Sequence, residues 1–93
     1  MIISFKDKRT ERIASGAHVR GFPTDLVNRT INKLTILDNA TTLEDLRSPP
    51  GNRLETLAGN RFGQHSIRIN DQWRICFMWT DRGAELVEIV DYH

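Results

Sequence analysis

The hydrophobic residues of this chain repeat with two different periods. Between residues 24 and 39 apolar positions recur every three or four residues, which is typical of one buried face of a helix. In 64–70 and 73–79 apolar and polar residues alternate instead, as they do in half-buried strands. A last apolar run, 84–90, is rich in β-branched residues and is typical of a buried strand. The pattern predicts a helix followed by an antiparallel sheet.

Shorter signals complete the first half of the chain. We expect a strand over residues 1–5 that starts the sheet, and a short helix over 6–15. A turn over 43–47 is expected with Thr42 as its cap, followed by a Pro-Pro-Gly loop and a possible strand over 53–57. Together the patterns predict an α+β fold, with two to three N-terminal helices packed on an antiparallel β-sheet.

Length and composition set limits on the class of protein. The 93 residues are enough for a single domain, residues 1–93, with one hydrophobic core. No apolar run approaches the roughly 20 residues that cross a bilayer, and the start of the chain lacks the apolar region of a signal peptide. One cysteine, Cys76, has no internal disulfide partner. We therefore expect a soluble cytoplasmic protein that has no membrane partner.

The positive charge is unevenly distributed, although the net charge is only +1. Between residues 47 and 74 every positive side chain is an arginine, and none is a lysine: Arg47, Arg53, Arg61, Arg68 and Arg74. A guanidinium can contact a phosphate with two hydrogen bonds, whereas an ammonium acts as a point charge. The distribution is compatible with a nucleic-acid contact and equally with an ordinary solvated surface.

Several kinds of site are not indicated by the sequence. His18, His65, His93 and Cys76 show no spacing typical of metal-ligand pairs, so no metal site is expected. No glycine-rich phosphate loop follows a strand, and no serine or cysteine nucleophile signature is present. We expect no cofactor.

The densest group of proton-transfer side chains lies in the last three residues, Asp91, Tyr92 and His93. If the last strand continues that far, Asp91 and His93 have the same parity and point to one face. Such a group is a candidate for acid–base chemistry. The alternative is that Asp91 forms a structural ion pair with an arginine and that His93 lies free in solvent.

Three arginines are candidates to join this tail. Arg68 and Arg74 lie opposite the large apolar residues of their own predicted strands, and Arg61 lies on the preceding turn. Folding of the strands would bring all three to the same end of the sheet. An acid, an imidazole and several arginines are the groups needed to cleave RNA without a metal. A base takes the ribose 2′-OH proton, arginines stabilise the phosphorane, and an acid protonates the departing 5′ oxygen.

Motifs distributed along the whole chain carry a resemblance to a known family. They are the opening Met1-Ile2-Ile3-Ser4-Phe5-Lys6, Leu54-x-x-Leu57-x-Gly59-x-Arg61, Ser66-Ile67, Trp73-Arg74-Ile75-x-Phe77 and the final Asp91-Tyr92-His93. Together they resemble HigB-type toxins of the RelE/ParE superfamily. The resemblance implies a RelE-like, microbial-RNase-like fold and a metal-independent endoribonuclease that cuts mRNA in the ribosomal A site. It also implies a HigA-like antitoxin with a helix-turn-helix domain, and operator DNA bound by the toxin–antitoxin complex.

The resemblance also implies roles for individual residues. His93 is the acid or base, and Asp91 tunes or orients it. Tyr92 stacks on a base or positions the ribose, with a core-packed ring as the alternative. Arg74 steadies the scissile phosphate, unless it pairs with Asp91. Arg61 contacts the RNA backbone, or is a free surface charge.

Two positions depart from the family pattern, and one candidate has no counterpart in it. Glu55 and Ala58 stand where the family commonly has histidine and lysine. Glu55 is either a general base or a surface acid that lowers RNA affinity, and loss of the lysine weakens phosphate contact. Arg68 is an RNA-binding candidate from strand parity alone. We expect a working but comparatively weak toxin.

Two other functions stay open at this point. A ParE-like protein poisons DNA gyrase without cleaving RNA, although gyrase poisoning does not need the proton-transfer groups of the tail. A weakened toxin would act mainly by antitoxin binding and operator co-repression.

Overall fold

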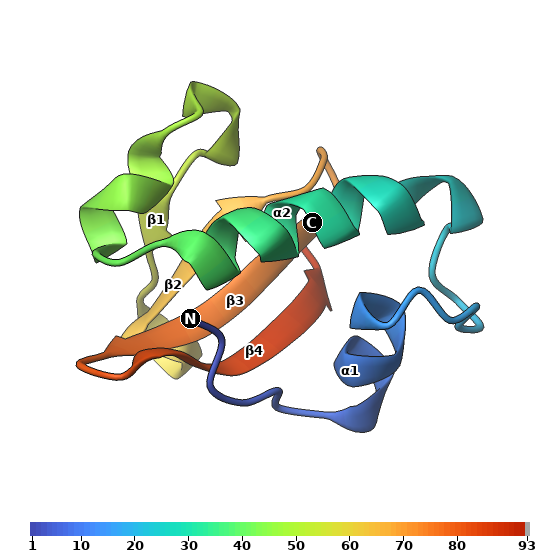
Figure 1. Cartoon of the computed structure of the whole chain (residues 1–93), viewed down its shortest axis with the longest axis horizontal. Coiled ribbons are helices and arrows are strands. Elements are labelled where there is room, and N and C mark those ends of the chain that lie inside the picture. The colour runs from blue at the N-terminus through green and yellow to red at the C-terminus, as the bar shows by residue number, and fades with distance from the viewer. Residues whose placement is uncertain (93) are drawn as a thin grey trace.

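The computed structural model describes residues 1–92 and has two α-helices packed on a four-stranded antiparallel sheet (Figure 1). The strands are neighbours in chain order, β1-β2-β3-β4. This architecture confirms the predicted α+β fold. The elements are α1 (Lys8–Ala14), α2 (Val27–Asn39), β1 (Glu55–Thr56), β2 (Gln64–Arg68), β3 (Trp73–Thr80) and β4 (Gly83–Asp91), with 3₁₀ helices η1 (Thr24–Leu26), η2 (Leu43–Arg47), η3 (Pro50–Asn52) and η4 (Gly59–Arg61).

The core lies between α2 and one face of the sheet. In Figure 1 α2 crosses that face, and α1 lies beside the outer strand β4. Ile75 of β3 is paired with Ile67 on one side and Ile89 on the other, and all three side chains are buried. Leu34 and Leu37 of α2 are buried in the same cluster. Because strand side chains alternate, the residues between these isoleucines point to the outer face of the sheet.

The first residues do not form the predicted strand at the start of the sheet. They make only two isolated parallel bridges to β4, Ile2 with Ala84 and Phe5 with Val87. The reason is a bulge in β4 at Leu86, which has a φ of 52° and donates its backbone N–H to the hydroxyl of Ser4. A bulge interrupts regular pairing, so the segment follows the edge of β4 without becoming a full strand. It still covers that edge.

The hairpin between β3 and β4 turns at Asp81 and Arg82, as the sequence predicts. Gly83, which follows, has a φ of 134°, and a Cβ placed there would lie 2.2 Å from the carbonyl oxygen of Met1. Only glycine allows the first residue to approach β4 this closely.

The segment before β1 differs most from the prediction. The predicted cap is confirmed, since Thr42 and Asp45 form a reciprocal capping box at the start of η2. The strand expected over residues 53–57 is shorter and covers only Glu55–Thr56. Arg53 instead ends η3 in the left-handed conformation, with φ 44° and ψ 57°. In the described part of the chain no helix is long and apolar enough to cross a bilayer.

Candidate functional site

Arg74 is the centre of the polar outer face of the sheet, and it is only 7% exposed. Its Nε donates to Oγ of Ser66 at 2.8 Å, and its Nη2 donates to the carbonyl oxygen of Arg53 at 2.6 Å. Its Nη1 lies 3.8 Å from Oε1 of Glu55. These contacts hold the guanidinium in one orientation, which a binding site for a charged group requires.

A polar cavity of about 370 Å³ opens next to Arg74, and we call it the arginine pocket. Its lining residues come from three strands and the loops beside them: Arg53, Glu55, Arg68, Asn70, Asp71, Arg74 and Tyr92. Arg68 forms an ion pair with Asp71. Tyr92 is 39% exposed, and the centroid of its ring lies 5.9 Å from Cζ of Arg74, within cation–π distance. The pocket thus combines three guanidinium groups with an aromatic ring open to solvent.

Arg61 lines a neighbouring hollow of about 350 Å³ together with Val90, Asp91 and Tyr92. Its Nη1 donates to Oε1 of Gln64 at 3.1 Å. Because Tyr92 lines both cavities, the two arginine sites are adjacent on the molecule.

The register of β3 and β4 separates Asp91 from Arg74. Arg74 is paired with Val90, and Asp91 is paired with Trp73, whose side chain belongs to the core. Since side chains alternate along a strand, Asp91 and Arg74 leave the sheet on opposite faces. Asp91 accepts a hydrogen bond from Nε2 of Gln72 at 3.2 Å. The structure therefore places these two residues at the same end of the sheet but not on the same face.

The predicted site residues thus fall into three groups. The arginine pocket unites Glu55, Arg68, Arg74 and Tyr92. Arg61 and Asp91 belong to the adjacent hollow, and His93 lies outside the described residues.

Two residues of the site are missed by the sequence reasoning. Ser66 has the same strand parity as Arg68, and this parity is the signal that points to its contact with Arg74. Arg53 was expected to begin a strand, and its position beside Arg74 depends on its left-handed conformation. No local pattern in the sequence indicates that conformation for an arginine.

Other titratable groups lie away from this pocket. His65 is paired with Phe77 on the core side of the sheet, and partial burial lowers its pKa. Burial raises the pKa of the Cys76 thiol, which lies beneath the charged side chains of the outer face. Among residues 1–92 no group of three or more His, Cys, Asp or Glu side chains is arranged to hold a metal ion.

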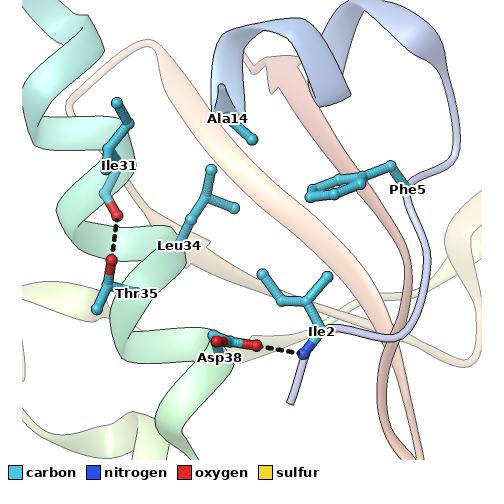
Figure 2. Close-up of a pocket in the computed structure, with 7 residues that line it drawn as sticks. All are labelled: Ile2, Phe5, Ala14, Ile31, Leu34, Thr35 and Asp38. Atoms are coloured by element: carbon cyan, nitrogen blue, oxygen red, sulfur yellow. Dashed lines mark hydrogen bonds between the residues drawn. The ribbon is translucent and has the colours of Figure 1, made fainter. Parts of the chain in front are cut away.

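A different cavity, of about 330 Å³, lies on the helical side of the molecule (Figure 2). It is lined by Ile2, Phe5, Ala14, Ile31, Leu34, Thr35 and Asp38. The carboxylate of Asp38 accepts the backbone N–H of Ile2 at 2.8 Å, as Figure 2 shows. None of these described lining residues carries a positive charge, in contrast to those of the arginine pocket.

Comparison with known proteins gives a consistent family assignment. The family described as RelE-like toxin of type II toxin–antitoxin system HigB matches residues 3–93. Toxin HigB-1 of Vibrio cholerae serotype O1 is 44% identical over 94 residues, covering 100% of this chain and 98% of that protein. Endoribonuclease HigB of Proteus vulgaris is 32% identical over 93 residues, covering 100% of both chains.

A structural comparison supports the same fold. The chain superposes on a chain of the YoeB–YefM complex from Staphylococcus aureus with a TM-score of 0.64 and 19% identity. The match covers 100% of this chain and 95% of the other, and at this identity it shows the fold alone. With the family match over nearly the whole sequence, the chain belongs to the HigB family of RelE-like toxins from type II toxin–antitoxin systems.

Proposed function

We propose that this toxin is a ribosome-dependent, metal-independent endoribonuclease that cuts mRNA and so arrests translation. The observation that carries the proposal is the arginine pocket, where a fixed guanidinium lies beside an exposed tyrosine ring. A relative from Proteus vulgaris that is 32% identical in sequence is named an endoribonuclease. RNA offers phosphates to the guanidinium groups and bases to the ring.

Arg74 is suited to bind the scissile phosphate. Two of its three guanidinium nitrogens already donate hydrogen bonds: Nε to the hydroxyl of Ser66, and Nη2 to the carbonyl oxygen of Arg53. The third, Nη1, faces Glu55 at 3.8 Å, which is longer than a hydrogen bond. An N–H on Nη1 is therefore available for a phosphate oxygen, and the charge that develops in the phosphorane would strengthen that contact.

Proton transfer is assigned to the residues around this phosphate. One group removes the proton of the ribose 2′-OH, which attacks the phosphorus, and another protonates the departing 5′ oxygen. Glu55, whose side chain is 52% exposed beside Arg74, is a candidate base. His93 is the candidate acid or alternative base, and Asp91 orients it. Tyr92 stacks on a base or positions the ribose. Arg61 and Arg68 contact the RNA backbone on either side of Tyr92.

The partners follow from the type of module. A type II toxin is held inactive by a protein antitoxin, and the structurally similar YoeB is found in a complex with YefM. We therefore propose a HigA-like antitoxin with a helix-turn-helix domain, operator DNA bound through the complex, and the cytoplasmic ribosome as the target.

The test is mRNA cleavage on programmed ribosomes by the intact protein and by His93→Ala. We expect cuts only when ribosomes are present, and their loss in the variant. A 2′-deoxy nucleotide at the cleaved position should also prevent cutting, because it removes the nucleophile. Absence of cuts with the intact protein would reject the proposal and direct attention to gyrase.

A second function, a weakened toxin that mainly binds its antitoxin, is favoured by the substitutions at residues 55 and 58. Glu55 places a negative charge in the pocket, and Ala58 offers no cation. Deletion of Tyr92 and His93 separates the two functions. It should abolish toxicity if the protein is a nuclease and leave antitoxin affinity unchanged.

A further inference from the structure

Arg53 has a backbone conformation that is unusual for a residue with a side chain. Its φ is 44° and its ψ is 57°, and its N–H donates to the carbonyl oxygen of Pro50 at 3.1 Å. Glycine is the residue that occupies this region without a steric cost. An arginine in such a position directs attention to its functional groups.

The neighbouring Asn52 fixes this conformation. Its side chain is fully buried, and its Nδ2 donates to the carbonyl oxygens of Leu46 at 3.1 Å and Ser48 at 3.2 Å. Its Oδ1 accepts a hydrogen bond from Nζ of Lys33 at 2.7 Å. The backbone that leads into Arg53 is therefore anchored to two other parts of the chain.

This conformation directs two groups of Arg53 to the same place. The carbonyl oxygen accepts a hydrogen bond from Nη2 of Arg74 at 2.6 Å. Arg53 is exposed, and it is also one of the residues that line the arginine pocket. The residue whose carbonyl oxygen helps to orient the central guanidinium thus adds a second positive charge to the same pocket.

The charge balance of the pocket distinguishes Arg53 from the other two arginines. Arg68 is paired with Asp71, and Arg74 lies near Glu55. Within residues 1–92 the Arg53 guanidinium forms no ion pair or side-chain hydrogen bond, and the residue is exposed. Among the three arginines of the pocket, Arg53 is the one with no carboxylate of the described chain within ion-pair distance.

We propose that Arg53 is an RNA-binding residue of the arginine pocket and contacts a phosphate oxygen of the strand held by Arg74. The proposal rests on the proposed function and adds a contact that family motifs and strand parity do not assign. A phosphate group has several oxygens, so Arg53 and the fixed guanidinium of Arg74 can each contact one of them.

The left-handed backbone makes a clean variant available. Arg53→Gly removes the guanidinium but favours the same φ, so the hydrogen bond from Arg74 to the backbone carbonyl should persist. Arg53→Lys keeps the charge. Arg82→Ala removes a positive charge from the hairpin at the opposite end of β3 and serves as the matched control.

The experiment is an NMR titration of the free protein with uridine 3′-monophosphate, following the Nε–H signal of Arg74. We expect the affinity to fall about threefold to fivefold in Arg53→Gly, to recover partly in Arg53→Lys and to stay unchanged in Arg82→Ala. In the ligand-free Arg53→Gly protein the Arg74 signal should keep its wild-type position, which shows that the pocket is intact.

Equal affinity of Arg53→Gly and the wild type would overturn the proposal, and so would absence of binding by the wild type. Nucleotide binding is measured without ribosomes and without cleavage. The proposal for Arg53 and the proposed nuclease activity can therefore be rejected independently of each other. A wild type that binds the nucleotide through Arg53 but cuts no mRNA would reject the nuclease alone.

Discussion

Oε1 of Glu88 lies 3.0 Å from Nη1 of Arg61, on the outer face of the sheet. The same oxygen lies 3.6 Å from Nζ of Lys6, so one carboxylate is shared by two cations. The hydrogen bond from Arg61 to Glu88 is the largest cause that raises the pKa of Arg61. Glu88 thus offsets positive charge beside the proposed RNA site.

We predict that Glu88→Gln binds programmed ribosomes more tightly than the wild type. Glutamine keeps an acceptor for Arg61 but removes the negative charge, so both cations become available to phosphates. At low salt the affinity should rise roughly threefold, as expected for a partly exposed pair. The measurement is binding as a function of salt concentration, where the slope should steepen. Unchanged or weaker binding would show that the carboxylate does not compete with RNA.

Replacing the two unusual residues of the family pattern should raise activity. The double variant Glu55→His/Ala58→Lys removes the carboxylate that lies 3.8 Å from Arg74. It also adds a cation at residue 58, just after strand β1. Both changes favour a bound phosphate, and the imidazole can transfer protons, so we expect cleavage on ribosomes to become about tenfold faster. Glu55→Gln and Ala58→Lys, made singly, separate the two effects. Unchanged or lower cleavage by the double variant would contradict the prediction.

Arg74 should support the fold as well as the site. Arg74→Ala leaves the hydroxyl of Ser66 and the carbonyl of Arg53 without their donor. We expect the free energy of unfolding to fall by about 2–4 kcal/mol. Urea unfolding followed by tryptophan fluorescence measures this change. Arg82→Ala, on the exposed hairpin, should change stability by less than about 0.5 kcal/mol. An equally small effect for Arg74→Ala would mean that its contacts are not structural.

The Cys76 thiol should be unreactive in the native protein. The residue is completely buried, and burial raises its pKa, so little thiolate forms near neutral pH. At pH 8 iodoacetamide should modify it roughly a hundredfold more slowly than in the urea-unfolded chain. A cysteine introduced by Arg82→Cys is the exposed reference. Comparable rates at the two positions would disprove the burial of Cys76 in solution.

The carboxylate of Asp45 should make the stability of the protein depend on pH at the acidic end of the range. Hydrogen bonds from the backbone N–H groups of Thr42 and Thr41 lower its pKa from 3.8 to about 2. Because the folded pKa lies below the ordinary value, the stabilisation is complete above pH 4 and is lost as the pH falls through 2. Asp45→Asn should have a lower Tm than the wild type at pH 7, and the difference should disappear toward pH 2. A difference that does not vary with pH would contradict this origin.

Several features of the fold and the site could be predicted because their causes are local. The period of three to four over residues 24–39 predicts the helical segment formed by η1 and α2. Alternation predicts that Arg68 and Arg74 lie opposite the core residues, and the register confirms it. The turn at Asp81 and Arg82 follows from residues that favour a hairpin.

Other features depend on contacts between distant segments. The weak pairing of residues 1–5 reflects the bulge at Leu86, which alternation does not reveal. The separation of Asp91 from Arg74 follows from the register, which pairs Asp91 with Trp73. A shift of one residue in register moves a side chain to the other face, so the pattern alone does not decide which groups meet.

The sequence by itself determined the class of fold, the order of the two helices and of strands β2 to β4, and the family to which the chain belongs. Periodicity and motifs are properties of neighbouring residues, and they need no knowledge of the contacts across the molecule. Only the tertiary structure decided how the site is assembled, because Arg53 and Arg74 are 21 residues apart in the chain. Their contact depends on a left-handed backbone that buried Asn52 holds in place, and such an arrangement exists only after the separate segments have packed together.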